Sequence, residues 1–324
     1  MATVLVTGVG GVGGTATVRS LLEHTTHDVV GADMKPLAAG MYLPERRAVV
    51  PPAHSDDWLP EVLDVIERHG VEGVLPLVDE ELSRLSELRE RTPADVAFVA
   101  PKTDVVDTAL DKYRLARALE GHDMAVPLTK LASDVDDLSE FGFPSVLKPR
   151  RGHGSQGLKV LDAPGKLEEH LAAFGGSADE LIVQEFIDGT EFTTSAVVTR
   201  DDDLLAVVPK EVIQKEGNTV RGVTREASAI TRTCRSIHEA LQPHGPINVQ
   251  QIVDSETGTP YTIEINPRFS STACLTVAAG VNELDLLIRD AIGERVQPPD
   301  GFRTDLQILR YTDQLFVPEG DLLH

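Results

Sequence analysis

The stretch YTIEINPRFSST, residues 261–272, sets three polar side chains at alternate positions: Glu264, Asn266 and Arg268. Side chains two residues apart on a β-strand project from the same face, so we expect these three on one surface. Gln250 lies on the preceding strand-like segment and would stand beside Glu264 in a hairpin. Carboxylate and amide oxygens suit Mg²⁺, and an arginine fork suits phosphate. We therefore predict a metal and phosphate site, with a buried ion pair as the structural alternative.

A glycine-rich loop follows a strand in FPSVLKPRRGHGSQG, residues 143–157. The strand ends at Lys148, whose ammonium group can meet a phosphate as a point charge. Gly152, Gly154 and Gly157 can adopt positive φ and expose their N–H groups, so the loop can fold over a triphosphate. The same pattern also fits a flexible surface hairpin.

A third segment, VQEFIDGTEF at residues 183–192, runs from a strand into a turn. The backbone of Glu185, Phe186 and Ile187 can hydrogen-bond the edge of an adenine. Glu191 can then accept hydrogen bonds from ribose hydroxyls. Taken alone, this segment is as typical of an ordinary strand-turn-strand.

The first hundred residues alternate strand-like and helix-like segments. Apolar residues at three-to-four spacing indicate helices, and short apolar runs indicate buried strands. Such alternation predicts a doubly wound parallel sheet with right-handed crossovers. The expected strands are 4–7, 29–32, 71–77 and 96–101, and the expected helices are 15–24, 58–70 and 79–91, with Asp79 as an N-cap.

The first strand leads into VTGVGGVGG, where Gly8, Gly10 and Gly13 satisfy G-x-G-x-x-G. With Asp33 twenty residues after Gly13, this pattern is typical of a dinucleotide site. No tyrosine has a lysine four residues after it, so the Tyr-x-x-x-Lys pair of short-chain dehydrogenases is absent. Glycines at such a turn also occur simply to let a helix pack on a strand. An NAD-dependent oxidoreductase stays an alternative, and the denser motifs downstream weigh against it.

After Pro101 the pattern becomes mixed α+β. Two short helices come first, with Asp111 capping the second and Gly121 near its end. The strands expected after them are 158–161, 181–186, 191–200, 204–212, 247–254 and 261–269, and the helices are 165–174 and 227–241. We predict an α/β, Rossmann-like first domain followed by a larger α+β domain.

Composition limits the classes of function. The chain has 324 residues, enough for two or three packed units, and a formal net charge of −22. A nucleic-acid footprint is basic, so no nucleic-acid partner is expected, and the acidity suggests a salt-adapted source. No membrane-length apolar run or signal-peptide pattern is present, and two cysteines are too few for a disulfide framework. We expect a cytoplasmic protein without membrane contact.

Taken in order, these motifs resemble the ATP-grasp superfamily. The similarity is greatest to single modules of the carbamoyl-phosphate synthase large chain and to related amino-acid ligases. It runs through VLVTGVGGVGG, DKYRLARAL, VLKPRRGHGSQG, VQEFIDGTEF, INVQQIV, IEINPRFSS and LRYTDQLFV, and so spans most of the chain. The resemblance implies a Rossmann-like pre-ATP-grasp domain (1–103), a small ATP-grasp subdomain bearing a mobile glycine-rich lid (104–183), and a large subdomain with the nucleotide and metal site (184–324).

The resemblance also implies a role for each motif residue. Lys112 and Lys148 resemble phosphate-contacting cations, Glu191 the ribose-binding acid, and Arg268 the residue that supports the transferred phosphoryl group. Lys148 and Arg268 would also be catalytic. The other implied positions are the nucleotide-binding residues Gly152, His153, Gly154, Ser155, Gln156, Gly157, Gln184, Glu185, Phe186 and Ile187, and the metal ligands Gln250, Glu264 and Asn266. In these relatives the glycine-rich first domain shapes the acceptor-substrate cleft and does not bind NAD.

Residues 208–226 are cation-dense for so acidic a chain. Four cations are candidates for holding the acceptor carboxylate or the γ-phosphate: Lys210, Lys215, Arg221 and Arg225. The sequence does not choose among them, and we place Lys210 with the catalytic residues. A solvated loop with ion pairs to its own glutamates is the alternative.

The implied reaction is carboxylate–amine ligation. A carboxylate would attack the γ-phosphate of MgATP, and an amine would capture the acyl phosphate, giving an amide or peptide bond, ADP and phosphate. ATP and Mg²⁺, or Mn²⁺ in its place, are the implied cofactors. Small amino-acid-like carboxylates and amines are the implied partners, and a homodimer is one assembly that we consider. The alternatives are carbamoyl-phosphate synthesis, with activation of bicarbonate or carbamate, and a non-catalytic nucleotide sensor.

Overall fold

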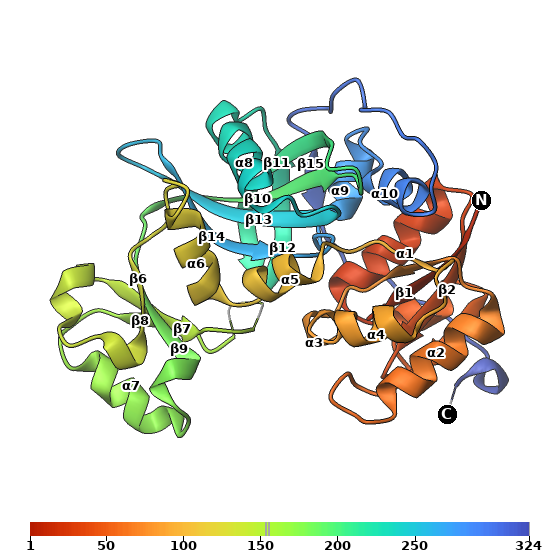
Figure 1. Ribbon diagram of the computed structural model, residues 1–324, viewed down its shortest axis with the longest axis horizontal. Coiled ribbons are helices and arrows are strands. Elements are labelled where there is room, and N and C mark those ends of the chain that lie inside the picture. Colours follow the sequence, from red (N-terminus) through yellow and green to blue (C-terminus); the bar gives the residue numbers. More distant parts are fainter. Residues whose placement is uncertain (153, 155, 324) are drawn as a thin grey trace.

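The computed structural model describes residues 1–152, 154 and 156–323. Figure 1 shows three bodies in a row: the amino-terminal domain, a central sheet and a small sheet domain at the far end. Two of the predicted loop residues, His153 and Ser155, lie outside the described residues. In the part of the chain that the structure describes, no helix has the length and apolar character needed to pass through a bilayer.

The first domain is a five-stranded parallel sheet in the order β3-β2-β1-β4-β5. The strands are β1 (Thr3–Thr7), β2 (Asp28–Asp33), β3 (Arg46–Val49), β4 (Gly73–Leu75) and β5 (Ala97–Phe98), and the helices are α1 (Val12–His24), α2 (Trp58–His69), α3 (Asp79–Leu82) and α4 (Leu85–Arg91). The doubly wound prediction is confirmed. Strand β3 was not predicted because only Ala48 in it is buried, which leaves no apolar run to read.

Glycines close the turn from β1 into α1. Gly8 has a φ of +67°, and a Cβ on Gly14 would lie only 2.1 Å from the Gly8 carbonyl oxygen. Only glycine avoids this collision, so the first turn of α1 can pack directly on the end of β1. The helix therefore begins at Val12, three residues before the predicted start at Thr15.

The single helix expected over 79–91 is broken into α3 and α4. Arg84, at the break, has φ −106° and ψ 10°, outside the helical range. Its guanidinium donates to the carbonyl oxygen of Ala53 at 2.7 Å, and this long-range bond favours the turn over a continuous helix. Asp79 is not an N-cap: that position is taken by Val78, and Asp79 is the first helical residue.

The small domain is a four-stranded antiparallel sheet in the order β6-β9-β7-β8. Its strands are β6 (Thr129–Leu131), β7 (Ser145–Pro149), β8 (Lys159–Leu161) and β9 (Leu181–Glu185), and α7 (Lys166–Phe174) packs on it through Leu167. Before it come α5 (Thr103–Ala109) and α6 (Lys112–Glu120), which contact the central sheet. Asp111 caps α6 as predicted, accepting a hydrogen bond from the Arg114 N–H.

The central sheet is antiparallel, in the order β14-β13-β10-β11-β12-β15. Its strands are β10 (Gly189–Val198), β11 (Leu204–Glu216), β12 (Asn218–Thr224), β13 (Pro246–Asp254), β14 (Pro260–Asn266) and β15 (Gln307–Leu309), and the helices beside it are α8 (Ser228–Leu241), α9 (Ala273–Ala278) and α10 (Glu283–Ala291). Both predicted hairpins are confirmed. Edge strand β15 was not predicted, since three residues show no periodicity. Short 3-10 helices cover Ala39–Tyr42, Ala132–Asp134, Leu138–Phe141, Ala178–Glu180 and Glu319–Asp321.

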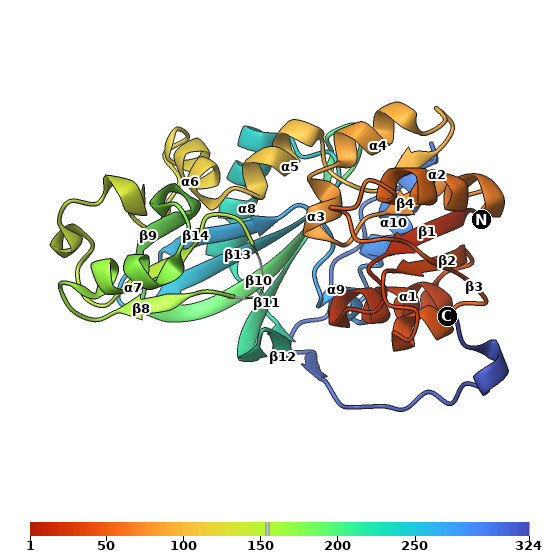
Figure 2. The same cartoon turned by 90° about the horizontal axis from the view of Figure 1, so that it is seen from below.

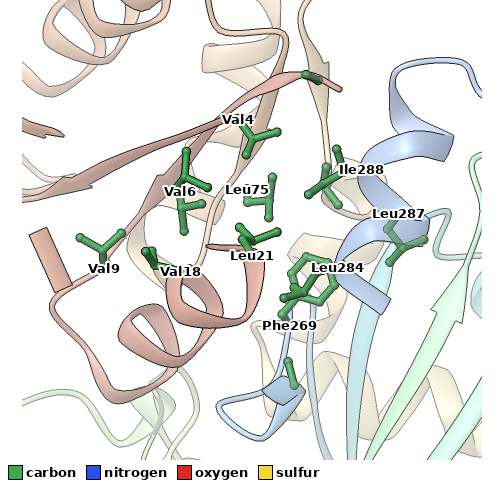
Figure 3. Close-up of a cluster of buried hydrophobic side chains, with 14 of the residues drawn as sticks. Val4, Val6, Val9, Val18, Leu21, Leu75, Phe269, Leu284, Leu287 and Ile288 are labelled. Atoms are coloured by element: carbon green, nitrogen blue, oxygen red, sulfur yellow. The ribbon is translucent and has the colours of Figure 1, made fainter. Parts of the chain in front are cut away.

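The first domain and the carboxyl-terminal helices share one hydrophobic core. Val4 and Leu21 of the first domain are buried in the same cluster as Phe269 and Leu284 (Figure 3). After β15 the chain returns as an extended segment past α1 (Figure 2), where the N–H of Leu323 donates to the Tyr42 hydroxyl at 3.0 Å. This packing fixes the first domain against the central sheet. The predicted domain limits at 103 and 183 stay a prediction.

Candidate functional site

The hairpin of β13 and β14 carries the predicted metal ligands. Gln250 lies directly opposite Glu264, as predicted, and Asn248 lies opposite Asn266. One cavity of about 230 Å³, here called the metal-face cavity, is lined by Gln250, Glu264, Asn266 and Arg268. One carboxylate and two side-chain amides fit Mg²⁺ when phosphates and water fill its other positions. Among the described residues no three His, Cys, Asp or Glu side chains gather closely enough to hold a metal alone.

Arg268 lies beyond the strand that was predicted to carry it, because β14 ends at Asn266. Asp79 of the first domain holds its guanidinium through Nε at 2.6 Å and Nη2 at 3.3 Å, and Nη2 also donates to Asn266 Oδ1 at 3.2 Å. Burial lowers the pKa of Arg268, but Asp79 and Glu264 outweigh burial and the net shift is upward. The guanidinium is therefore charged and fixed at the edge of the cavity. Sequence reasoning missed Asp79, whose one signal is its place just after strand β4.

A cavity of about 270 Å³, here called the nucleotide cleft, shares Glu191, Gln250 and Glu264 with the metal-face cavity. The predicted residues that line it are Lys112, Lys148, Gly152, Gln156, Gln184, Glu185, Phe186, Ile187, Glu191, Gln250 and Glu264. Gly154 lines the metal-face cavity. Gly157 lies against Pro149 and lines neither cavity, and all three loop glycines have the predicted positive φ. Mobility of this loop stays a prediction.

Apolar side chains from both antiparallel sheets line the nucleotide cleft: Leu158 and Val160 from the region of β8, and Ile252 and Ile263 from β13 and β14. Apolar surface of this kind suits the flat faces of an aromatic base. Sequence reasoning missed Ile263, because strict alternation would turn it away from Glu264. The register of β13 and β14 shifts between Gln250 and Gln251, and this irregularity lets Ile263 and Glu264 both reach the cleft.

Lys148 lies at the end of β7, inside the nucleotide cleft. Its Nζ donates to Gln184 Oε1 at 2.8 Å, and Gln184 donates in turn to the Thr129 hydroxyl at 2.9 Å. Burial lowers the pKa of Lys148 to about 8; Glu264 raises it, while Lys112 and Lys215 lower it further. The three lysines repel one another, so the cleft favours an anion.

Lys112 links the glycine loop to the metal face. Its Nζ donates to the carbonyl oxygen of Gly152 at 2.5 Å and lies 3.7 Å from Glu264 Oε1. Asp111 binds Arg150 at the start of the loop through Nε at 2.8 Å and Nη2 at 2.8 Å. The start of α6 therefore holds the first residues of the loop in place.

Two residues of the segment 183–192, here called the connector, do not have free side chains. Glu185 Oε2 accepts a hydrogen bond from the Leu128 N–H at 3.1 Å, so its carboxylate is turned back toward β6. Glu191 Oε1 accepts from Lys215 Nζ at 2.6 Å. Phe186 is 43% exposed beside the cleft, while Ile187 is buried.

The structure distinguishes the four cations of 208–226. Lys215 lines both the nucleotide cleft and the metal-face cavity. Arg225 is bound to Glu211 and Asp305 instead, and Arg221 is exposed; neither lines either cavity.

The prediction that Lys210 acts in the cleft is wrong. Its side chain is 0% exposed and lines neither cavity. Its Nζ donates to Ser195 Oγ at 2.6 Å and to Thr276 Oγ1 at 2.8 Å, and Glu283 lies close enough to influence its charge. Helices α9 and α10, which carry Thr276 and Glu283, cover the Lys210 side chain. No local sequence pattern in β11 predicts this burial.

We expect ADP affinity to depend on the charge of Lys148. Since the pKa of this group is lowered to about 8, the ammonium is charged below that pH, and its contribution is lost as pH rises above it. Calorimetric titration with ADP, without metal, should show binding that weakens from pH 8 to pH 9.5. Lys148→Arg should flatten the profile, since arginine stays charged throughout. Equal slopes for the two proteins would contradict the role of Lys148.

The chain matches the family described as ATP-grasp domain over residues 109–272 and the family described as PylC-like, N-terminal domain over residues 4–99. The carbamoyl phosphate synthase large chain of Caldanaerobacter subterraneus is 24% identical over 258 residues, 74% of this chain and 24% of that protein. The carbamoyl-phosphate synthase of Methanobrevibacter smithii is 22% identical over 296 residues, 86% of this chain and 75% of that protein. The chain thus spans about a quarter of the large chains that it matches.

Solved structures share the fold. The biotin carboxylase of Campylobacter jejuni superposes with a TM-score of 0.74 at 15% identity, over 95% of this chain and 74% of that one. The L-amino acid ligase of Bacillus licheniformis gives a TM-score of 0.68 at 18% identity, over 90% of this chain and 74% of that one. The family match begins at Ala109 and ends at Thr272, so it contains the glycine loop, the connector and the whole metal face. The chain belongs to the ATP-grasp family.

Proposed function

We propose that this protein is a Mg²⁺- and ATP-dependent carboxylate–amine ligase. One observation carries the proposal: a third cavity, of about 540 Å³, lies between the first domain and the central sheet and shares Asn218, Arg268 and Ser271 with the metal-face cavity. We call it the acceptor chamber. A phosphoryl group held at Arg268 would face this chamber, which is separate from the nucleotide cleft and large enough for a small organic substrate.

The proposed role of each side chain follows from its position in the cavities and from its charge. Lys112 and Lys148 would hold phosphate oxygens, while the apolar side chains that line the nucleotide cleft would hold the base. Gln250, Glu264 and Asn266 would hold Mg²⁺, which when bound neutralises phosphate charge and orients the γ-phosphate. Arg268 would stabilise the charge of the phosphoryl group during transfer to the substrate carboxylate. Catalysis would then rest on positioning and electrostatics.

Structures of the same fold support the nucleotide part. One is the Hydrogenobacter thermophilus 2-oxoglutarate carboxylase domain with MgADP and bicarbonate, and another is an N5-carboxyaminoimidazole ribonucleotide synthetase with ADP. We extend ATP and Mg²⁺, or Mn²⁺ in its place, to this chain. We also propose the three-part domain division with a mobile lid, small amino-acid-like carboxylates and amines as substrates, and a cytoplasmic location. A homodimer stays an untested assembly.

The runner-up is carbamoyl-phosphate synthesis, which would activate bicarbonate or carbamate. The similarity to the carbamoyl phosphate synthase relatives favours it. Amino-acid-dependent and bicarbonate-dependent ADP release distinguish the two activities.

An oxidoreductase is disfavoured by Asp33. Its Oδ2 accepts from the Gly10 N–H at 2.7 Å and its Oδ1 from the Lys35 N–H at 2.9 Å. The carboxylate therefore stabilises the glycine turn through hydrogen bonds to the backbone and does not stand unbonded where it could bind ribose hydroxyls.

We expect ADP release to require both Mg²⁺ and a carboxylate–amine mixture. The purified protein would be assayed with MgATP and the twenty standard amino acids, then with bicarbonate and ammonia, in a coupled assay for ADP. Stimulation by the amino acids supports the ligase, and stimulation only by bicarbonate supports the runner-up. If neither stimulates release while MgADP still raises the melting temperature, a nucleotide sensor replaces both.

A further inference from the structure

The acceptor chamber is lined in part by residues of the first domain that line neither the nucleotide cleft nor the metal-face cavity. It is lined both by Arg268 and by Glu81, which belongs to α3 and follows strand β4 of the parallel sheet. Glu81 is 6% exposed. A carboxylate is costly to bury unless something binds it, so the contacts of Glu81 indicate what the chamber is built to do.

Among the described residues, the two side chains that donate hydrogen bonds to the Glu81 carboxylate are both neutral. The Thr7 hydroxyl donates to Oε2, and Trp58 Nε1 donates to Oε1 at 3.4 Å. Burial raises the pKa of Glu81 to about 7; the Thr7 and Trp58 bonds lower it, and Asp33 and Glu80 raise it further. Asp79 differs, since its carboxylate is matched by the Arg268 guanidinium. Glu81 lines the chamber, and near pH 7 its carboxyl group is present in both the neutral and the charged form.

Other charged groups surround this carboxylate. Asp33 is bound by two backbone N–H groups, and the Arg84 guanidinium binds Glu87 and lies 4.8 Å from the centre of the Trp58 ring. The remaining charged or titratable groups that line the chamber are Lys35, His54, Asp79, Glu80 and Arg268.

We propose that the acceptor chamber binds the amine substrate and that Glu81 takes the proton which this amine must lose before it attacks. The inference rests on the proposed ligase function and deepens it. An ammonium group has no free electron pair, so one proton must leave before the N–C bond can form. Glu81 is a buried proton acceptor in the chamber that opens onto Arg268, where the acyl phosphate would form.

The step needs only the amine, the acyl phosphate and Glu81. The ammonium passes one proton to the Glu81 carboxylate, and its nitrogen then forms a bond to the acyl carbon. The C–O bond to phosphate breaks as the second proton leaves the nitrogen, and phosphate departs carrying that proton. Glu81 returns its own proton to solvent when the product leaves.

Trp58 offers a direct readout, because it is the only tryptophan of the chain. Its indole N–H donates to Glu81, so its fluorescence should titrate with that carboxyl, with a midpoint near pH 7. Glu81→Gln should remove the transition, whereas His54→Asn should leave it. Methylammonium in the chamber should move the midpoint to lower pH, since a cation favours the charged carboxylate. A transition that survives Glu81→Gln, or that methylammonium at saturating concentration leaves in place, overturns the proposal.

The second experiment compares two nucleophiles. Hydroxylamine is largely uncharged at neutral pH and needs no proton acceptor before attack. With MgATP and the amino-acid mixture, Glu81→Gln should form hydroxamate at the wild-type rate but form amide at least about a hundredfold more slowly. The exposed Glu90→Gln, on the neighbouring helix, is the matched control. Equal loss of both products would show that Glu81 is only structural, and no loss of either would show that it is not used.

A milder variant guards against misfolding of Glu81→Gln. Thr7→Val removes a donor that lowers the pKa of Glu81. The rise of amide formation with pH should therefore move to higher pH, while hydroxamate formation keeps its profile; an unmoved profile overturns the proposal. If the wild type forms neither amide nor hydroxamate, the ligase function itself fails and this inference fails with it. If the wild type is active but Glu81→Gln does not slow amide formation selectively, the ligase function is retained and the role of Glu81 is rejected.

Discussion

Glu264→Gln should lower the rate of ADP release by roughly a thousandfold, which corresponds to about 4 kcal/mol of lost transition-state stabilisation. Glu264 supplies the only carboxylate among the three proposed metal ligands. It also lies 3.7 Å from Lys112 and raises the pKa of Lys148. The amide keeps the shape of the side chain but removes the charge that serves both the metal and the two lysines.

This result would be measured by ADP release and, independently, by the thermal shift that MgADP produces compared with ADP alone. The variant should lose most of the Mg²⁺-dependent part of the shift. Glu256→Gln makes the same change in the exposed turn of the same hairpin and should behave as wild type. Near-normal turnover by Glu264→Gln would remove the metal face from the mechanism. Arg268→Ala is the less clean variant, because it leaves the Asp79 carboxylate without its partner.

Lys210→Met should destabilise the folded protein by about 3–5 kcal/mol, the usual cost of leaving one member of a buried charge pair alone. Burial lowers the pKa of Lys210 to about 8 and raises that of Glu283, so each group depends on the other to stay charged. Without Lys210, the network of Ser195, Thr276 and Glu283 retains a buried carboxylate with only hydroxyl partners.

The stability loss should depend on pH. In Lys210→Met, the pKa of Glu283 in the folded state lies above its value in the unfolded chain, so the unfolded chain holds fewer protons. Stability is therefore retained at low pH and falls as pH rises above the ordinary glutamate pKa of about 4.3 toward the raised pKa of the folded state. Adding Glu283→Gln should recover most of the loss and remove this pH dependence. Urea unfolding of the four proteins of the cycle would measure the coupling, and additive effects of the two changes would contradict it.

The same cycle tests the corrected role of Lys210. A double variant that folds should keep normal ADP release, because neither side chain lines the acceptor chamber, the nucleotide cleft or the metal-face cavity. Sequence alone could not separate Lys210 from Lys215. In a regular strand an odd spacing puts them on opposite faces, but β11 has register shifts next to Val212 and Gln214 that break the alternation between them.

Local sequence patterns determined much of the secondary structure and strand pairing of this protein. Apolar periodicity predicted the parallel first domain and both antiparallel hairpins, because burial of one face depends on residues close in sequence. The spacing from Gln250 to Glu264 set the register of the metal face, and the loop glycines have the positive φ that their type allows.

Tertiary structure decided how those faces are used. Asp79 and Arg268 are 189 residues apart, and their ion pair exists only because the first domain packs on the central sheet. The burial of Lys210, the entry of Ile263 into the nucleotide cleft and the placement of Glu81 in the acceptor chamber have the same origin. Periodicity in a sequence tells which side chains share a face. What covers that face, and with which charge, is set by segments that folding brings from elsewhere in the chain.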